Sequence, residues 1–188
     1  RPNVALISTG DELVMPGVAD SLLAYRYDGR QLEVDLGCLF TREDTFDLRI
    51  IYTAYPEGTG DTEASADRGL YFINADGSDG DKPRQVWTHG ETAWNSFWFP
   101  TIDQPNERFT HTIRLIIADS MQTLSNGLLQ EQRSLPDGMR SDLWVMDQPH
   151  APYLVMMAVG DWAVIQDSVG SLPLSYYVEP EYADYAKE

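Results

Sequence analysis

Short apolar runs separated by turn dipeptides constrain the fold of this chain more than any other feature. Gln31–Leu36 alternates apolar and polar residues, and it follows Leu22–Tyr27 across an Asp28-Gly29 turn. This alternation is typical of a strand with one buried face, and two such runs around a glycine turn predict a hairpin. The sequence contains no convincing amphipathic helix of about ten residues or more. It therefore predicts an all-β fold.

Further strand signals follow along the chain. Phe46–Ile50 alternates in the same way and continues into Ile51–Tyr55 before Pro56 ends it. Tyr153–Val159 is apolar throughout, which is expected of a strand buried on both faces. The remaining predicted strands are Leu70–Ile73, Thr110–Ile117, Gln122–Ser125, Leu143–Met146 and Trp162–Ile165. The polar, glycine-rich segments 56–68 and 74–81 predict loops.

The composition is that of a folded and strongly acidic domain. Hydrophobic residues make up 43% of the 188 residues, which is ample for a packed core. The formal net charge of −17 disfavours nucleic acids and anionic membranes as partners, because both recruit basic surfaces. No apolar run approaches the roughly 18–20 residues of a transmembrane helix. Cys38 is the single cysteine, so an internal disulfide is excluded, and its apolar neighbours predict a buried thiol.

Known catalytic and metal-binding motifs are missing from the sequence. A helical zinc motif places two imidazoles one turn apart, whereas the three histidines are isolated: His89, His111 and His150. We therefore expect this chain to bind no zinc. The acids Asp76, Asp79 and Asp81 do not fit a calcium loop, and a solvated hairpin tip accounts for them. There is no G-x-S-x-G elbow and no phosphate-binding glycine loop.

One carboxylate has an unusual setting. Glu91 ends the segment Trp87-Thr-His-Gly-Glu91, just before the aromatic and proline-rich stretch Trp98–Arg108. Glycine permits a tight turn and proline fixes φ, and a loop carboxylate among aromatic residues can bind an ammonium group through charge-assisted hydrogen bonds. The residues alone also allow a simpler interpretation. In it, Glu91 is a solvated loop acid and Asp103 only caps a turn.

Four separated segments, in order, resemble the N-terminal domain of the aminopeptidase N family of zinc metallopeptidases. They are Trp87–Glu91, Phe99–Pro105, Leu124–Gly127, and Pro149–Leu154 leading to Val159–Asp161. The resemblance implies a saddle-shaped β-sandwich, or curved double sheet, of mostly antiparallel strands that packs on a thermolysin-like catalytic domain. It implies that residues 1–178 form this β domain without its first strands. Residues 179–188 would then be a linker to a catalytic domain outside this chain.

The resemblance also implies roles for two residues. A family glutamate, two residues past a Thr-Gln pair, helps to bind the free α-amino group of the substrate, and it corresponds to Glu91. The family glutamine corresponds to His89, which would line the pocket for the first residue and whose imidazole can make one hydrogen bond. No cofactor is implied for this chain, and zinc is implied for the absent catalytic domain. The implied partners are that domain of the same polypeptide and the N-terminus of a peptide substrate.

Two functions are left open by these observations. In the first, the chain is the non-catalytic, substrate-anchoring domain of a zinc aminopeptidase that removes N-terminal residues from peptides, and it is inert by itself. In the second, it is a β-sandwich binding or scaffold module of the same descent that has lost the chemistry, with His89 as a sign of that loss. The chain opens at Arg1-Pro2, which favours a trimmed or mature fragment. The sequence leaves the compartment open, and the resemblance to bacterial family members that carry export signals is compatible with an extracytoplasmic location.

Overall fold

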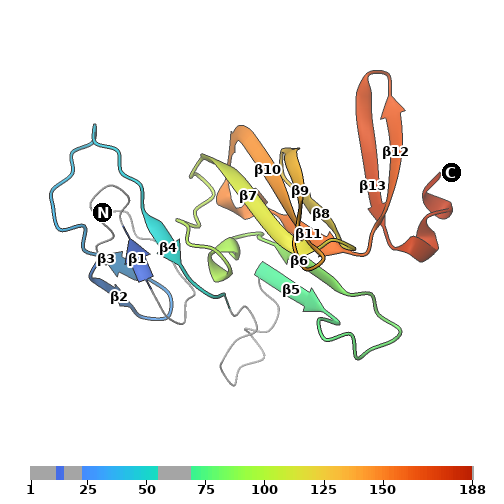
Figure 1. The fold of residues 1–188 in the computed structure, drawn as a ribbon. Helices are drawn as coiled ribbons and strands as arrows, with labels where there is room; N and C mark the ends of the chain where they lie inside the picture. Colours follow the sequence, from blue (N-terminus) through green and yellow to red (C-terminus); the bar gives the residue numbers. More distant parts are fainter. Residues whose placement is uncertain (1–11, 15–22, 55–68, 188) are drawn as a thin grey trace. The chain divides into compact units, whose positions relative to one another are not determined.

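Strands dominate the computed structural model, which describes residues 12–14, 23–54 and 69–187 (Figure 1). The strands are β1 Glu12–Val14, β2 Tyr25–Tyr27, β3 Leu32–Val34, β4 Arg49–Ile51, β5 Gly69–Ile73, β6 Gln85–His89, β7 Phe109–Ala118, β8 Gln122–Ser125, β9 Leu128–Leu135, β10 Met139–His150, β11 Met157–Gly160, β12 Ala163–Val169 and β13 Leu172–Val178. The helices of the described residues are single 3-10 turns: η1 Asn95–Phe97, η2 Pro152–Leu154, η3 Pro180–Tyr182 and η4 Tyr185–Lys187. None of them is long and apolar enough to cross a bilayer. The predicted all-β class with mostly antiparallel strands is confirmed.

The chain divides into two compact units, and the first consists of Arg1–Leu70, His89–Arg108 and His150–Leu154. In this unit β2 and β3 form the predicted hairpin, with Tyr27 opposite Leu32. The Asp28 carboxylate accepts the backbone N–H groups that follow it in the turn, as aspartate commonly does at this position. Strand β4 pairs antiparallel with β1.

The core of the first unit is built around the hairpin. Leu32 is 3% exposed, and partly buried side chains pack against it: Leu23, Tyr27, Val34, Leu48, Ile50 and Tyr52. The hydroxyl of Tyr52 donates a 3.0 Å hydrogen bond to the carbonyl oxygen of Trp98. Burial raises the pKa of Tyr52 to about 12, so this hydroxyl remains a hydrogen-bond donor even in alkaline solution. The hairpin core is therefore fastened to the segment that follows η1.

The second unit consists of Tyr71–Thr88, Phe109–Pro149 and Val155–Glu188. One sheet has the order β7-β10-β9, a second has the order β5-β6-β11-β8, and β12 and β13 form a separate hairpin. Figure 1 shows β7, β10 and β9 side by side in the yellow and orange part of the ribbon. In the second sheet Ala158 of β11 lies between Trp87 of β6 and Leu124 of β8. The pairing of β10 with β9 shifts register between Leu143 and Trp144.

A buried polar network joins β8 to β10 in the second unit. Arg140 holds Asp142 through two contacts, Nε to Oδ1 at 2.9 Å and Nη2 to Oδ2 at 3.0 Å. The hydroxyl of Thr123 donates to Asp142 at 2.7 Å and accepts the Trp144 indole N–H at 3.0 Å. Asp142 is fully buried. Burial raises the pKa of its carboxyl, but the hydrogen bonds from Arg140 and Thr123 outweigh burial and hold the pKa below its ordinary value.

Two sequence predictions for local structure were wrong. Cys38 is exposed, not buried, because Gly37 takes a positive φ of 69° and the Asp35 carboxylate accepts its N–H, which turns the chain out of the extended run. Tyr153–Val159 is not one strand, since η2 occupies its start and β11 begins only at Met157. Pro152 favours the first position of a helical turn, and the Leu154 N–H donates to the Ala151 carbonyl.

Other local predictions have mixed outcomes. The acidic tract Asn74–Asp81 lies between the paired strands β5 and β6, and the carboxylates of Asp76 and Asp79 accept backbone N–H groups within it. This confirms the prediction that the acidic tract forms the tip of a hairpin. The predicted loop at 56–68 lies outside the described residues. Strand β13 ends at Val178 and η3 and η4 follow, while the division into a domain of residues 1–178 and a linker of residues 179–188 stays a prediction.

Candidate functional site

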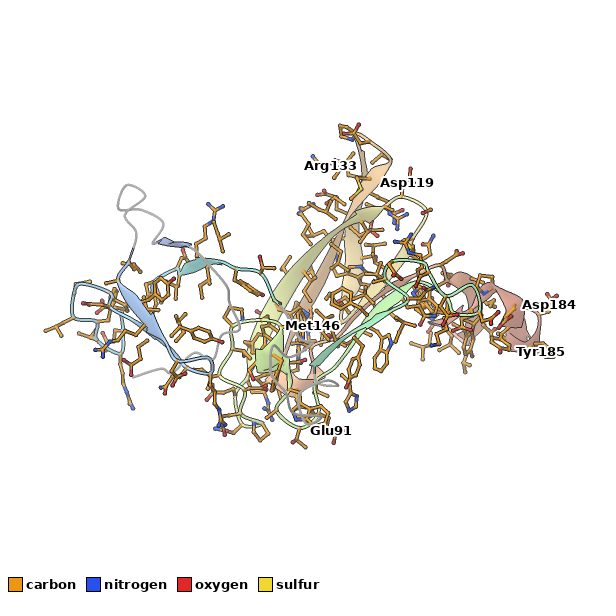
Figure 2. All side chains as sticks on the ribbon, turned by 90° about the horizontal axis from the view of Figure 1, so that it is seen from below. Glu91, Asp119, Arg133, Met146, Asp184 and Tyr185 are labelled. Carbon is orange, nitrogen blue, oxygen red and sulfur yellow. The ribbon has the colours of Figure 1, made fainter. Side chains whose placement is uncertain are left out.

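The turn that carries Glu91 begins where β6 ends at His89. The N–H of Trp94 donates to the carbonyl oxygen of Gly90 at 3.0 Å and closes the turn. The residues between them, Glu91, Thr92 and Ala93, are all exposed, and the Glu91–Thr92 peptide bond is cis. Figure 2 shows Glu91 at the lower edge of the view. Glu91 thus lies on a short turn whose two ends, Gly90 and Trp94, are joined by a hydrogen bond.

The Glu91 carboxylate makes no hydrogen bond or salt bridge to the residues that the structure describes. It is neither buried in the core nor neutralised by a local cation. An ionised carboxylate only accepts hydrogen bonds and has about four lone-pair sites for them. The side chain is therefore available to an external donor, and a cationic one would gain most.

His89 lies two residues before Glu91 and is also exposed. Its ring makes a T-shaped contact with Trp94, with ring centroids 6.1 Å apart and an interplanar angle of 66°. Both residues predicted for the site therefore lie at the same turn, one at the end of β6 and one at the tip. Sequence adjacency already required this closeness, so it does not by itself assign them a role.

Beneath the turn lies Asn95, whose side chain is completely buried. Its Nδ2 donates a 2.6 Å hydrogen bond to the carbonyl oxygen of Pro152, and its Oδ1 accepts the indole N–H of Trp98 at 2.8 Å. Pro152 itself is fully buried in η2. One amide thus links the residue after the turn to Trp98, which follows η1, and to the segment His150–Leu154, which belongs to the same unit.

Gly90 lies directly against this amide. A Cβ atom at Gly90 would stand 2.5 Å from the carbonyl oxygen of Tyr153 and closer still to the Asn95 amide nitrogen. Real Cβ atoms do not approach other atoms so closely, so a larger residue would push the turn away from its support. The need for glycine at this position comes from close packing.

Asp103 has the structural role that the simpler interpretation gave it. Its Oδ2 accepts the N–H of Ser96 at 2.8 Å at the start of η1, which confirms that it caps a turn. Its Oδ1 is buried and has no partner among the described residues. Asp103 therefore orders the segment after Glu91.

No group of three or more metal-ligating side chains exists among the described residues. His150 is buried, and its Nδ1 lies 2.9 Å from the carbonyl oxygen of Ala151. His89 is exposed at the turn, and His111 belongs to β7 of the other unit. A zinc site of the metallopeptidase kind needs three protein ligands around one ion, and the expectation that this chain binds no zinc stays a prediction.

Asn95 was missed in the sequence. A signal for it exists, because Trp94-Asn-Ser-Phe-Trp98 places one amide inside an aromatic run. A polar group in such surroundings is buried and must find hydrogen-bond partners. The sequence alone does not identify Pro152 as one of these partners.

Comparison with known proteins identifies the chain's relatives. Residues 19–154 match the family described as the Peptidase M1 N-terminal domain. Glutamyl aminopeptidase of Sus scrofa is 34% identical over 92 residues, which cover 47% of this chain and 10% of that protein. Aminopeptidase B of Homo sapiens is 27% identical over 121 residues, which cover 64% of this chain and 17% of that protein. The chain thus spans only a small part of the relatives that it matches.

Solved structures agree on the fold. An M1 zinc metallopeptidase of Deinococcus radiodurans, bound to a Tyr-Ser-Ala substrate, superposes with a TM-score of 0.70 at 16% identity, over 93% of this chain and 38% of that one. Legionella pneumophila aminopeptidase A, in complex with aspartic acid, gives a TM-score of 0.73 at 20% identity, over 97% of this chain and 20% of that one. Because the family match covers more than half of the sequence, the chain belongs to the N-terminal domain family of the M1 peptidases.

Proposed function

We propose that this chain is the substrate-anchoring domain of a zinc aminopeptidase, and that Glu91 binds the free α-ammonium group of a peptide. The observation that carries the proposal is an exposed carboxylate without a local partner in the described structure, on a turn with an ordered base. Membership of a family whose relatives are named aminopeptidases supports it.

An exopeptidase removes residues from one end of a chain, so it has to bind that end. It must recognise a cationic chain end at a fixed distance from the bond that it cleaves. A carboxylate held on a short turn meets this need, because charge-assisted hydrogen bonds to an ammonium group are short and strong. When a second domain covers the site and excludes water, the attraction between the two charges increases.

His89 is proposed to line the pocket for the first substrate residue. It is exposed two residues before Glu91, and its ring makes a T-shaped contact with Trp94. An imidazole nitrogen can donate or accept one hydrogen bond there. Hydrolysis itself is assigned to a catalytic domain of the same polypeptide, where a bound zinc ion would activate water.

The isolated chain is expected to be inert. The purified polypeptide should contain no stoichiometric zinc by elemental analysis, and it should not hydrolyse aminoacyl chromogenic substrates, because its described side chains provide no three-ligand metal site. Hydrolysis that survives repurification and follows this chain through a sizing column would contradict the proposal.

Replacing Glu91 by glutamine in the full-length polypeptide tests the anchoring role. The variant keeps the size of the side chain and removes its charge. We expect kcat/KM for peptides to fall by the equivalent of about 1–3 kcal/mol, which is what a hydrogen bond to a charged group contributes. Steady-state kinetics with dipeptide and tripeptide substrates would measure the loss.

Glu43→Gln is the matched control, because Glu43 is also exposed and its carboxylate has no partner in the described structure. Its kcat/KM should equal that of the unmodified protein. If Glu91→Gln is equally active, Glu91 does not anchor the substrate. A full-length polypeptide that is folded but cleaves no peptide would instead favour the scaffold function.

A further inference from the structure

The position of the Glu91 carboxylate is set by its turn, because the side chain itself is not held by the described residues. Its turn is closed by the hydrogen bond between Gly90 and Trp94, and the side chain makes no bond of its own to the described residues. The position and orientation of the carboxylate therefore depend on the residues that pack against the base of the turn. Gly90 rests on the Asn95 amide and on the carbonyl of Tyr153.

The chemistry of the two bonds to Asn95 specifies an amide. The Pro152 carbonyl can only accept a hydrogen bond, so it needs a donor, and the Trp98 indole N–H can only donate, so it needs an acceptor. Asparagine supplies one donor and one acceptor from a single planar group. Aspartate keeps the acceptor but turns a second oxygen toward the Pro152 carbonyl, and leucine leaves the buried Pro152 carbonyl and the partly buried Trp98 indole N–H without this partner.

We propose that Asn95 is the positioning residue for Glu91: its bonds to Trp98 and to Pro152 of η2 hold the turn where the Glu91 carboxylate meets a substrate ammonium group. This inference rests on the proposed function of Glu91. It assigns Asn95 no contact with substrate, and its effect on turnover passes through the Glu91 carboxylate.

A double-mutant cycle in the full-length polypeptide tests this coupling. Asn95→Asp should lower kcat/KM about 10- to 100-fold, because a misplacement of about 1 Å can cost that much. In the Glu91→Gln background the same substitution should lower kcat/KM by less than about threefold, since the group that it positions is already disabled. Asn74→Asp is the control. It also removes an amide donor, from bonds to the carbonyls of Asp79 and Lys82, and should leave kcat/KM unchanged.

Each outcome decides the inference. Equal losses from Asn95→Asp in both backgrounds would show that Asn95 only stabilises the fold, and no loss in the unmodified background would exclude its positioning role; both leave the function of Glu91 intact. If Glu91→Gln alone has no effect, the proposed function and this inference both fail. Should Asn95→Asp not fold, Trp98→Phe removes one of the two bonds and keeps an aromatic ring, and the same cycle with it should show the same coupling.

Discussion

Replacing Arg140 by leucine is expected to lower the free energy of unfolding by about 3–5 kcal/mol, as is usual when one partner of a buried ion pair is removed. The guanidinium contacts both carboxylate oxygens of Asp142 and donates to the carbonyls of Asp119 and Met121. Leucine would leave a fully buried carboxylate without a countercharge and two carbonyls without this donor. Urea unfolding followed by tryptophan fluorescence would measure the loss.

The pH dependence of this loss identifies its cause. Because the folded pKa of Asp142 is lowered, its contribution to stability is present above the unfolded value, near 4, and disappears as the pH falls through the folded pKa. The variant lacks that contribution, so the part of its loss that comes from Asp142 should shrink below about pH 4, while the part from the two carbonyls remains. Lys82→Met, at an exposed ion pair with Asp79, should cost less than about 1 kcal/mol. A similar loss in both variants would rule out burial as the reason.

Replacing Trp144 by alanine is expected to lower the free energy of unfolding by a comparable amount, about 3–5 kcal/mol. Trp144 is 6% exposed in β10, so alanine would leave a cavity where the indole packs. It would also remove the donor to the Thr123 hydroxyl. The same urea titration would measure the change.

Two comparisons separate the cavity from the hydrogen bond. Trp144→Phe keeps a buried aromatic ring but loses the indole N–H and the second ring, so it should cost about 1–2 kcal/mol for the hydrogen bond and less in total than Trp144→Ala. Trp87→Ala removes an indole that is 36% exposed and stacked on Tyr71, and it should cost less than Trp144→Ala. An equal cost for both alanine variants would show that burial of Trp144 does not govern its contribution.

Strands with one buried face could be predicted from the sequence, and strands without one could not. Thr110–Ile117 was predicted as a strand from its apolar residues, and β7 has the alternating burial of a strand with one buried face. Strand β9 was missed because it lies at the edge of its sheet and seven of its eight residues are exposed, so no periodic pattern is required of it. The three residues of β1 are too few to carry any pattern.

The candidate site also has one part that could be predicted from the sequence and one part that could not. The turn around Glu91 could be predicted because Gly90 and the prolines that follow it are residues typical of turns. The support of the turn could not be predicted, since it depends on the backbone carbonyl of Pro152. Every residue has such a carbonyl, so the sequence does not show which one Asn95 binds. The exposure of Cys38 was missed for a related reason, because a single backbone angle at Gly37 decided it.

The bond from Asn95 to Pro152 joins residues 57 positions apart, and this has a consequence for protein engineering. The segment Trp87–Trp98 cannot be grafted alone onto another scaffold, because its Asn95 would then lack the Pro152 carbonyl to which it donates. A transplant that keeps the geometry of the acidic side chain has to carry residues 150–154 as well.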